Sequence, residues 1–132
     1  MTRRRIWIAL LASSLAVAAA AQEAHSHHGD ETLGTVHFPV SCDEPVRTEF
    51  TRAVALLHSF GYEESRNAFA DVARRDPACG MASWGIAMTY YHPIWAPPTA
   101  GDLALGRAAA ETASKVGAKT ERERAYIEAI GL

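Results

Sequence analysis

Apolar residues recur every three or four positions from Ser41 to the end of this 132-residue chain. That spacing places them on one face of an α-helix, whereas a half-buried strand would need strict alternation. The pattern is interrupted at Gly61, at Asp76-Pro77, at His92-Pro93 and at Gly117. Glycine and proline at such breaks end helices, so the sequence predicts five helices and an all-α domain over residues 41–132.

Each predicted helix has an inner face. These faces are Phe50, Ala53, Val54, Leu57 and Phe60 in the first helix, Tyr62, Ser65, Ala68, Phe69, Val72 and Ala73 in the second, Met81, Trp84, Met88 and Tyr91 in the third, Leu103, Ala109, Ala110, Ala113 and Val116 in the fourth, and Tyr126, Ile127 and Ile130 in the fifth. No later helix follows to cover the fifth stripe. We therefore expect that stripe to be exposed and the chain to be the N-terminal part of a longer protein.

Three helix starts carry a capping box, in which a Ser or Thr side chain and a carboxylate three residues later satisfy free backbone N–H groups. The pairs are Ser41 with Glu44, Thr99 with Asp102, and Thr120 with Glu123. Pro45 also suits a first helical turn.

Residues 1–21 have the pattern of a secretory signal peptide. Three arginines at positions 3–5 precede a mainly apolar run over residues 6–15, and Ala19 and Ala21 give a small-x-small cleavage pattern. The run is too short to span a bilayer, and no other apolar run is long enough. We therefore expect an exported protein, periplasmic or secreted, with no transmembrane segment in the mature chain.

Residues 22–40 are predicted to form a flexible leader, because their first part lacks large apolar side chains. The end of the leader differs, since Val36, Phe38 and Val40 alternate with His37 and Pro39. We expect this part to lie extended against the first helix, and the proline argues against a central strand.

A cluster of histidines in the leader, His25, His27 and His28, lies close to Asp30 and Glu31. Imidazoles and carboxylates are ligands for Cu(II), Ni(II) and Zn(II), so a metal site is one interpretation. The alternative is a polar leader whose histidines occur by chance. Ordering a flexible segment around an ion would cost about 1–2 kcal/mol per residue, which favours the alternative.

Two cysteines, Cys42 and Cys79, remain in an oxidising compartment, where an even count favours a disulfide over free thiols. They lie at the starts of the first and third helices, which are neighbours when helix pairs stack. Neither belongs to a CxxC motif, so no redox or haem-attachment site is indicated. The chain has a formal charge of −2, and its basic residues form no stripe along the helices. We therefore expect that nucleic acid is not a partner.

The types and spacing of Tyr62, Ser65, Phe69 and Pro77 resemble one unit of the tetratricopeptide repeat (TPR) family. Tyr62 and Phe69 stand at the aromatic positions of its second helix, Ser65 at its small position and Pro77 at its terminal proline, while Trp84 lies about one position from the usual place. The phrases FPVSC, AVALLHSFGYEE and MASWGIAMTYYHPIWAPP are similar to exported bacterial proteins that contain these repeats. The resemblance implies antiparallel helix pairs stacked as a short solenoid, and it transfers no catalytic residue or ligand.

Stacked helix pairs form a groove, and His58, His92 and Trp95 are candidate contacts to a ligand or partner there. The alternative is that His58 caps its helix and His92 binds a loop carbonyl. No phosphate loop, nucleophile elbow or HExxH motif is present, so we expect no enzymatic activity.

The sequence favours a scaffold that binds a protein or peptide. The alternatives are a periplasmic metal-binding protein that uses His25, His27 and His28, and an N-terminal module of a larger hydrolase or transporter-associated protein.

Overall fold

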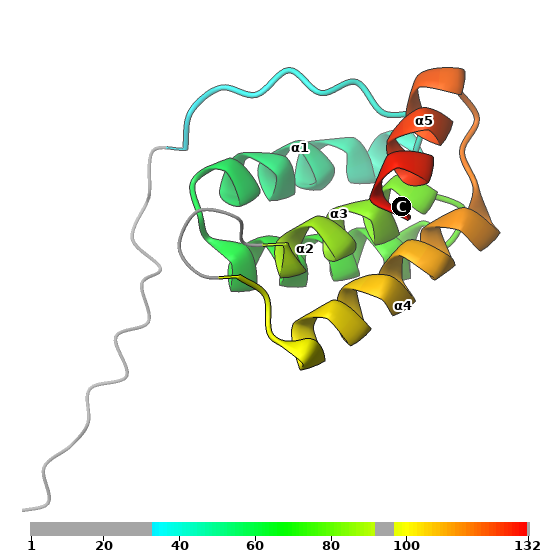
Figure 1. Cartoon of the computed structure of the whole chain (residues 1–132). Helices are drawn as coiled ribbons and strands as arrows, with labels where there is room; N and C mark the ends of the chain where they lie inside the picture. Colours follow the sequence, from blue (N-terminus) through cyan, green and yellow to red (C-terminus); the bar gives the residue numbers. More distant parts are fainter. Residues whose placement is uncertain (1–32, 92–96, 132) are drawn as a thin grey trace, which may run out of the picture. The chain divides into compact units, whose positions relative to one another are not determined.

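The computed structural model describes residues 33–91 and 97–131, and within them it contains five helices and no strand (Figure 1). The predicted all-α fold is therefore confirmed for this part of the chain. The helices are α1 (Glu44–His58), α2 (Tyr62–Arg75), α3 (Gly80–Tyr90), α4 (Ala100–Val116) and α5 (Glu121–Ile130). The predicted signal peptide and the histidines of the leader lie outside the described residues. No described helix combines the length and apolarity needed to cross a bilayer.

Helix α3 lies at the centre of the fold and contacts all four other helices (Figure 1). Its first six residues, Gly80 to Gly85, are all buried, including Met81 and Trp84. A helix that is apolar on every side is stable only when neighbours surround it. The small residues of α3 allow this, because they let adjacent helices approach closely.

The α1–α2 pair packs on α3 through aromatic rings. Phe50 of α1 and Phe69 of α2 are fully buried, with ring centroids 5.4 Å apart in an edge-to-face contact. The Ser65 hydroxyl on α2 donates a 2.8 Å hydrogen bond to the Ala53 carbonyl on α1, so a small polar side chain joins the two helices. The predicted inward positions Ser65, Phe69 and Trp84 are thus buried.

The start of α1 differs from the prediction. The N-cap is Asp43, with no side-chain capping bond, so Ser41 and Glu44 form no capping box. The Ser41 amide instead donates to the Glu123 carboxylate on α5 at 2.6 Å, and the Ser41 hydroxyl donates to the same carboxylate. An ionised acceptor from a distant helix has replaced the local one. Pro45 does occupy the first turn, as predicted.

The end of α1 also differs in detail. The helix ends at His58, and Phe60 adopts a left-handed backbone conformation with φ 64°. This turn lets the Gly61 amide donate to the Leu56 carbonyl at 3.0 Å, which satisfies a terminal acceptor. The turn also carries Phe60 off the helical stripe, so its predicted inward position is wrong and its side chain is 48% exposed.

Helix α4 has the predicted ends, a Thr99–Asp102 capping box and a stop at Gly117, whose φ is 73°. Its predicted inner face is correct only in the middle, because Ala110 and Ala113 are buried whereas Leu103 and Val116 are exposed. Among the described helices, α4 contacts only α3 and α5, and small side chains suffice to fill those contacts.

Helix α5 begins with the predicted Thr120–Glu123 capping box and packs back onto α3. Ile127 is buried in the core, and the Tyr126 ring lies 5.5 Å from that of Trp84. The expectation of an uncovered α5 stripe is therefore wrong for Ile127. The cover comes from α3 and from a segment that precedes α1, which the sequence pattern alone did not place there.

That segment, residues 33–42, is called the pre-helix segment below. It has no helix or strand and reaches α5 at its end (Figure 1). Its apolar residues, among them Val36, Phe38 and Val40, pack against the core, as expected for the alternating pattern. A disulfide joins Cys42 to Cys79, the predicted pairing, with Cα atoms 4.9 Å apart.

Candidate functional site

A groove of about 1110 Å³ opens between α3, α4 and the end of α5. The apolar part of its lining comes from Tyr90 and Tyr91 at the end of α3, Leu103 on α4 and Ile130 on α5. Leu103 is 52% exposed and Tyr91 is 55% exposed. Exposed apolar side chains that gather in one concave surface, unlike single exposed ones, mark candidate interaction sites, so the groove is a candidate binding surface.

The floor of the groove is shaped by small residues of α4. Gly106, Ala110 and Ser114 line it at intervals of four, which puts them on one face of the helix. A Cβ atom at Gly106 would lie 3.3 Å from Cβ of Tyr90, so glycine allows α4 to approach α3 closely at this point. Small residues of α4 therefore form one wall of the groove.

Charged side chains of both signs also line this groove. Arg107, Glu111 and Lys115 all lie on α4 and line the groove. None of the three forms an ion pair with another residue that the structure describes. Mixed charges around an apolar centre suit a protein segment better than a single anionic or cationic small molecule.

The sequence-predicted partner contacts are only partly placed. His58 is exposed in the last turn of α1 and does not line the groove. His92 and Trp95 lie outside the described residues, so their predicted contacts to a ligand or partner stay a prediction. His25, His27 and His28 also lie outside them, and the metal site in the leader stays a prediction too. The sequence missed the groove because its key residue, Leu103, matches an inward-facing pattern.

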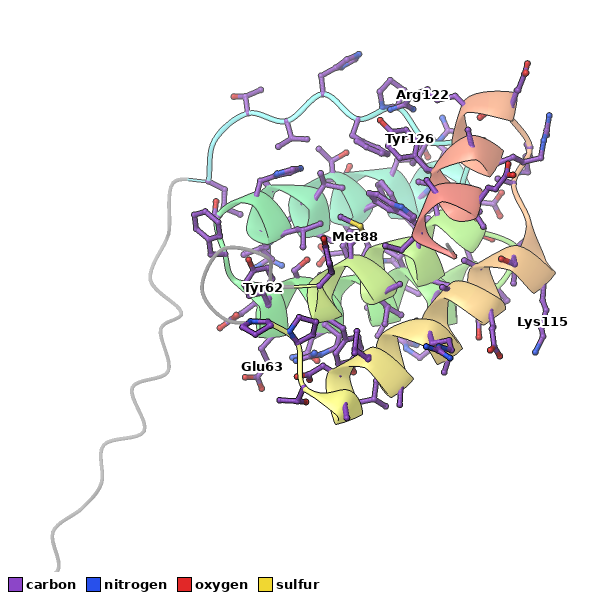
Figure 2. The ribbon with its side chains drawn as sticks, viewed as in Figure 1. Tyr62, Glu63, Met88, Lys115, Arg122 and Tyr126 are labelled. Atoms are coloured by element: carbon purple, nitrogen blue, oxygen red, sulfur yellow. A yellow bond between two sulfur atoms is a disulfide. The ribbon has the colours of Figure 1, made fainter. Side chains whose placement is uncertain are left out.

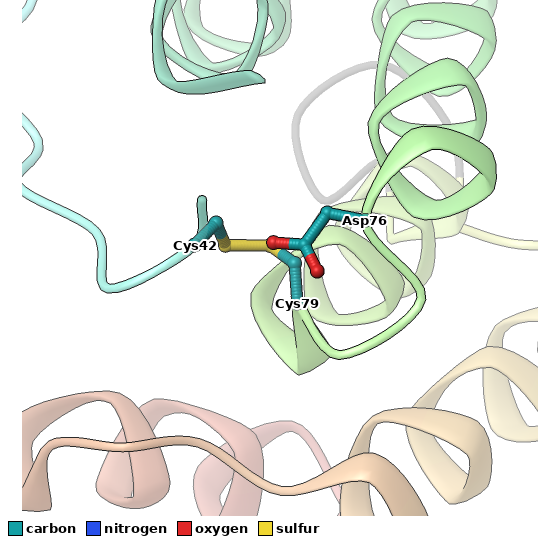
Figure 3. A group of neighbouring side chains, drawn as sticks. All are labelled: Cys42, Asp76 and Cys79. Atoms are coloured by element: carbon teal, nitrogen blue, oxygen red, sulfur yellow. A yellow bond between two sulfur atoms is a disulfide. The ribbon is translucent and has the colours of Figure 1, made fainter. Parts of the chain in front are cut away.

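A second cluster gathers Cys42, Cys79 and Asp76, whose possible ligand atoms lie within 4.8 Å of one another (Figure 3). Both sulfurs are joined in the disulfide and are therefore not free to bind a metal. The Asp76 carboxylate, 4% exposed, accepts the amide N–H groups of Asp43 at 2.8 Å and Ala78 at 3.1 Å. These bonds satisfy the buried carboxylate, so the cluster is a structural connection between the pre-helix segment and the α2–α3 turn.

A third cluster surrounds Glu123, which is 1% exposed. Its carboxylate accepts from the Ser41 amide and hydroxyl and from the Thr120 hydroxyl, the last at 2.8 Å. Burial raises the pKa of the Glu123 carboxyl, but these hydrogen bonds outweigh it and that pKa lies below its usual value. A carboxylate held ionised by its own chain is a poor proton donor, which argues against acid catalysis here.

Comparisons with protein-family models, with curated proteins and with solved structures find no match for the chain. A function must therefore be inferred from the surfaces themselves.

Proposed function

We propose that the protein is an exported helical scaffold, built like a short stack of TPR helix pairs, that binds a partner protein or peptide. Two features support the TPR-like interpretation. Helices α1–α2 and α3–α4 are sequential pairs, and the first, third and fifth helices are neighbours through α1–α3 and α3–α5 contacts. The Cys42–Cys79 disulfide supports export, because such bonds persist in oxidising compartments.

The observation that carries this proposal is the open groove between α3, α4 and α5. Leu103 projects from α4 beside a floor of small residues, with charges of both signs around it. A partner segment with an apolar stripe would cover Leu103 and Ile130, while its polar side chains meet Arg107 and Glu111 at the border. Because Leu103 is 52% exposed, covering it contributes about half of the roughly 1.5–3 kcal/mol that full burial of a leucine gives.

The test compares two substitutions on α4. Leu103→Asp puts a charge into the groove, whereas Leu105→Asp puts the same charge at a site that is equally exposed, at 54%, but outside the groove lining. Tagged mature protein would be isolated from its own host after chemical cross-linking, and partner recovery would be quantified for each variant. We expect Leu103→Asp to lose a partner that wild type and Leu105→Asp retain. Equal recovery with both variants would refute a role for the groove.

A further inference from the structure

One phenylalanine of the pre-helix segment is bound by side chains from three helices. The Phe38 ring centroid lies 5.8 Å from that of Phe50 on α1, 5.5 Å from Trp84 on α3 and 5.5 Å from Tyr126 on α5. The Arg122 guanidinium on α5 lies over the same ring at 4.7 Å. Phe50, Trp84, Arg122 and Tyr126 are called the Phe38-binding surface below. Figure 2 shows Arg122 and Tyr126 together beside the pre-helix segment.

The same surface also binds the backbone of the segment. Arg122 donates a 2.9 Å hydrogen bond to the Pro39 carbonyl, and Glu123 accepts the Ser41 amide at 2.6 Å. One cation thus binds a carbonyl and one anion binds an N–H group two residues later. Backbone recognition of this type, combined with a pocket for one aromatic ring, is how proteins bind extended peptides.

The way the segment is attached also resembles a bound peptide. Within the described residues, no backbone–backbone hydrogen bond links residues 33–42 to the helices. Its hydrogen bonds to α5 are made by the Arg122 and Glu123 side chains, and its covalent link is the Cys42–Cys79 disulfide. A segment held in this way can open without unfolding the helices, because no secondary structure has to break.

We propose that the Phe38-binding surface is a peptide-binding site, that residues 36–41 are its built-in ligand, and that a partner's extended segment with an aromatic residue followed by proline can replace them. The aromatic residue would occupy the place of the Phe38 ring. The following carbonyl would accept from Arg122, and the amide two residues later would donate to Glu123. This site is separate from the groove at Leu103 and does not depend on the function proposed for it.

The built-in ligand has an advantage that any partner must overcome. A tethered segment has an effective local concentration in the millimolar range, so a free peptide competes poorly while Phe38 is in place. Removing the Phe38 ring weakens the built-in ligand and leaves Phe50, Trp84, Arg122 and Tyr126 intact. The variant chain should therefore bind a matching peptide that the wild type excludes.

The probe is a fluorescein-labelled peptide with the sequence of residues 33–41, added to the mature full-length chain. We expect the Phe38→Ala chain to bind it about tenfold tighter, or more, than wild type does, as measured by anisotropy. Thr35→Ala, an exposed change in the same segment, should behave like wild type. A probe whose phenylalanine is replaced by alanine should not bind, and Arg122→Ala in the Phe38→Ala chain should reduce binding.

Equal binding to the Phe38→Ala and wild-type chains would overturn the proposal. If circular dichroism shows that the Phe38→Ala chain is unfolded, native-state hydrogen exchange of wild type decides instead. Faster exchange at the Ser41 amide than in α1, insensitive to low denaturant, supports a segment that opens alone. Exchange of that amide only through global unfolding refutes it. Because Leu103→Asp leaves this surface intact, a chain that carries both Phe38→Ala and Leu103→Asp should bind the probe as Phe38→Ala alone does, which separates the two proposed sites.

Discussion

Replacing Glu123 with glutamine tests whether one buried carboxylate holds the pre-helix segment on α5. The substitution keeps the shape of the side chain but removes its charge, and it turns one acceptor oxygen into an NH₂ donor. In the structure, the two oxygens accept from the Ser41 amide, the Ser41 hydroxyl and the Thr120 hydroxyl. The Ser41 and Thr120 hydroxyls can turn to accept, but a backbone N–H loses its acceptor in either orientation of the new amide: that of Ser41 if the NH₂ replaces Oε1, or that of Thr120, at 3.4 Å, if it replaces Oε2.

The expected loss follows from these contacts. A hydrogen bond to a charged group contributes about 1.5–3 kcal/mol, and a buried donor left without an acceptor costs about 1–3 kcal/mol. Thr120 is exposed and can turn to water, whereas Ser41 is half-buried. We therefore expect Glu123→Gln to lower the free energy of unfolding by about 2–3 kcal/mol, which corresponds to a fall in Tm of roughly 10–20 °C for a domain of this size.

Urea denaturation followed by circular dichroism measures this loss, with Glu121→Gln as the control. Glu121 also lies in the first turn of α5 but is exposed, so its substitution should cost less than about 0.5 kcal/mol. A double-mutant cycle with Ser41→Ala isolates the contribution of the Ser41 hydroxyl, because the backbone amide at position 41 remains in that variant. Equal stability of Glu123→Gln and wild type would refute the role assigned to this carboxylate.

The same residue predicts a pH dependence. Because the pKa of Glu123 is lower in the folded chain than in the unfolded one, its stabilisation is fully present above the unfolded pKa. It is lost as the pH falls from the unfolded value, about 4.3, through the folded one. Urea midpoints measured from pH 7 down to pH 3 should therefore fall more for wild type than for Glu123→Gln. Parallel curves would contradict this assignment.

Two other predictions concern covalent and packing constraints. Replacing Cys42 and Cys79 with alanine should lower the free energy of unfolding by about 3–4 kcal/mol, because the disulfide closes a loop with a sequence separation of 37. The intact mass after alkylation, with and without reductant, checks that the bond is present. Alkylation of both thiols without reduction would disprove the bond. Gly85→Ala should cost about 1–3 kcal/mol in thermal melts, since a Cβ there would lie 2.5 Å from the Phe69 ring. Gly101→Ala on α4 meets only the Thr99 hydroxyl at 3.6 Å and should change stability little, so equal effects of the two glycine substitutions would contradict the packing argument.

Local features were predictable where all the partners that they need lie within a few residues in the chain. The Thr99 and Thr120 capping boxes form as the sequence predicts, because each needs partners only three residues away. The Ser41 box fails, since Glu123 lies 82 positions along the chain and offers a buried carboxylate. Periodicity therefore identifies helices more reliably than it identifies the partners of their ends.

Exposure was harder to predict than helix position. The spacing of Leu103 suits an inner face, but α4 has neighbours on the side of Ala110 and Ala113 and none that covers Leu103 in the described chain. The candidate groove exists because neighbouring helices cover Ala110 and Ala113 but leave Leu103 exposed. A hydrophobic pattern records which residues share a helical face, and only the packing of neighbours decides how wide the buried part of that face is.

The sequence by itself determined the five helices, their breaks and the pairing of Cys42 with Cys79, since these depend on spacing, turn chemistry and the number of thiols. The tertiary structure alone decided that Phe38 of the pre-helix segment contacts α1, α3 and α5, and that the Glu123 carboxylate accepts the Ser41 amide. Contacts between residues more than 80 positions apart depend on the direction in which each helix leaves its turn. That direction is set by packing of the whole domain, which no local pattern in the chain contains.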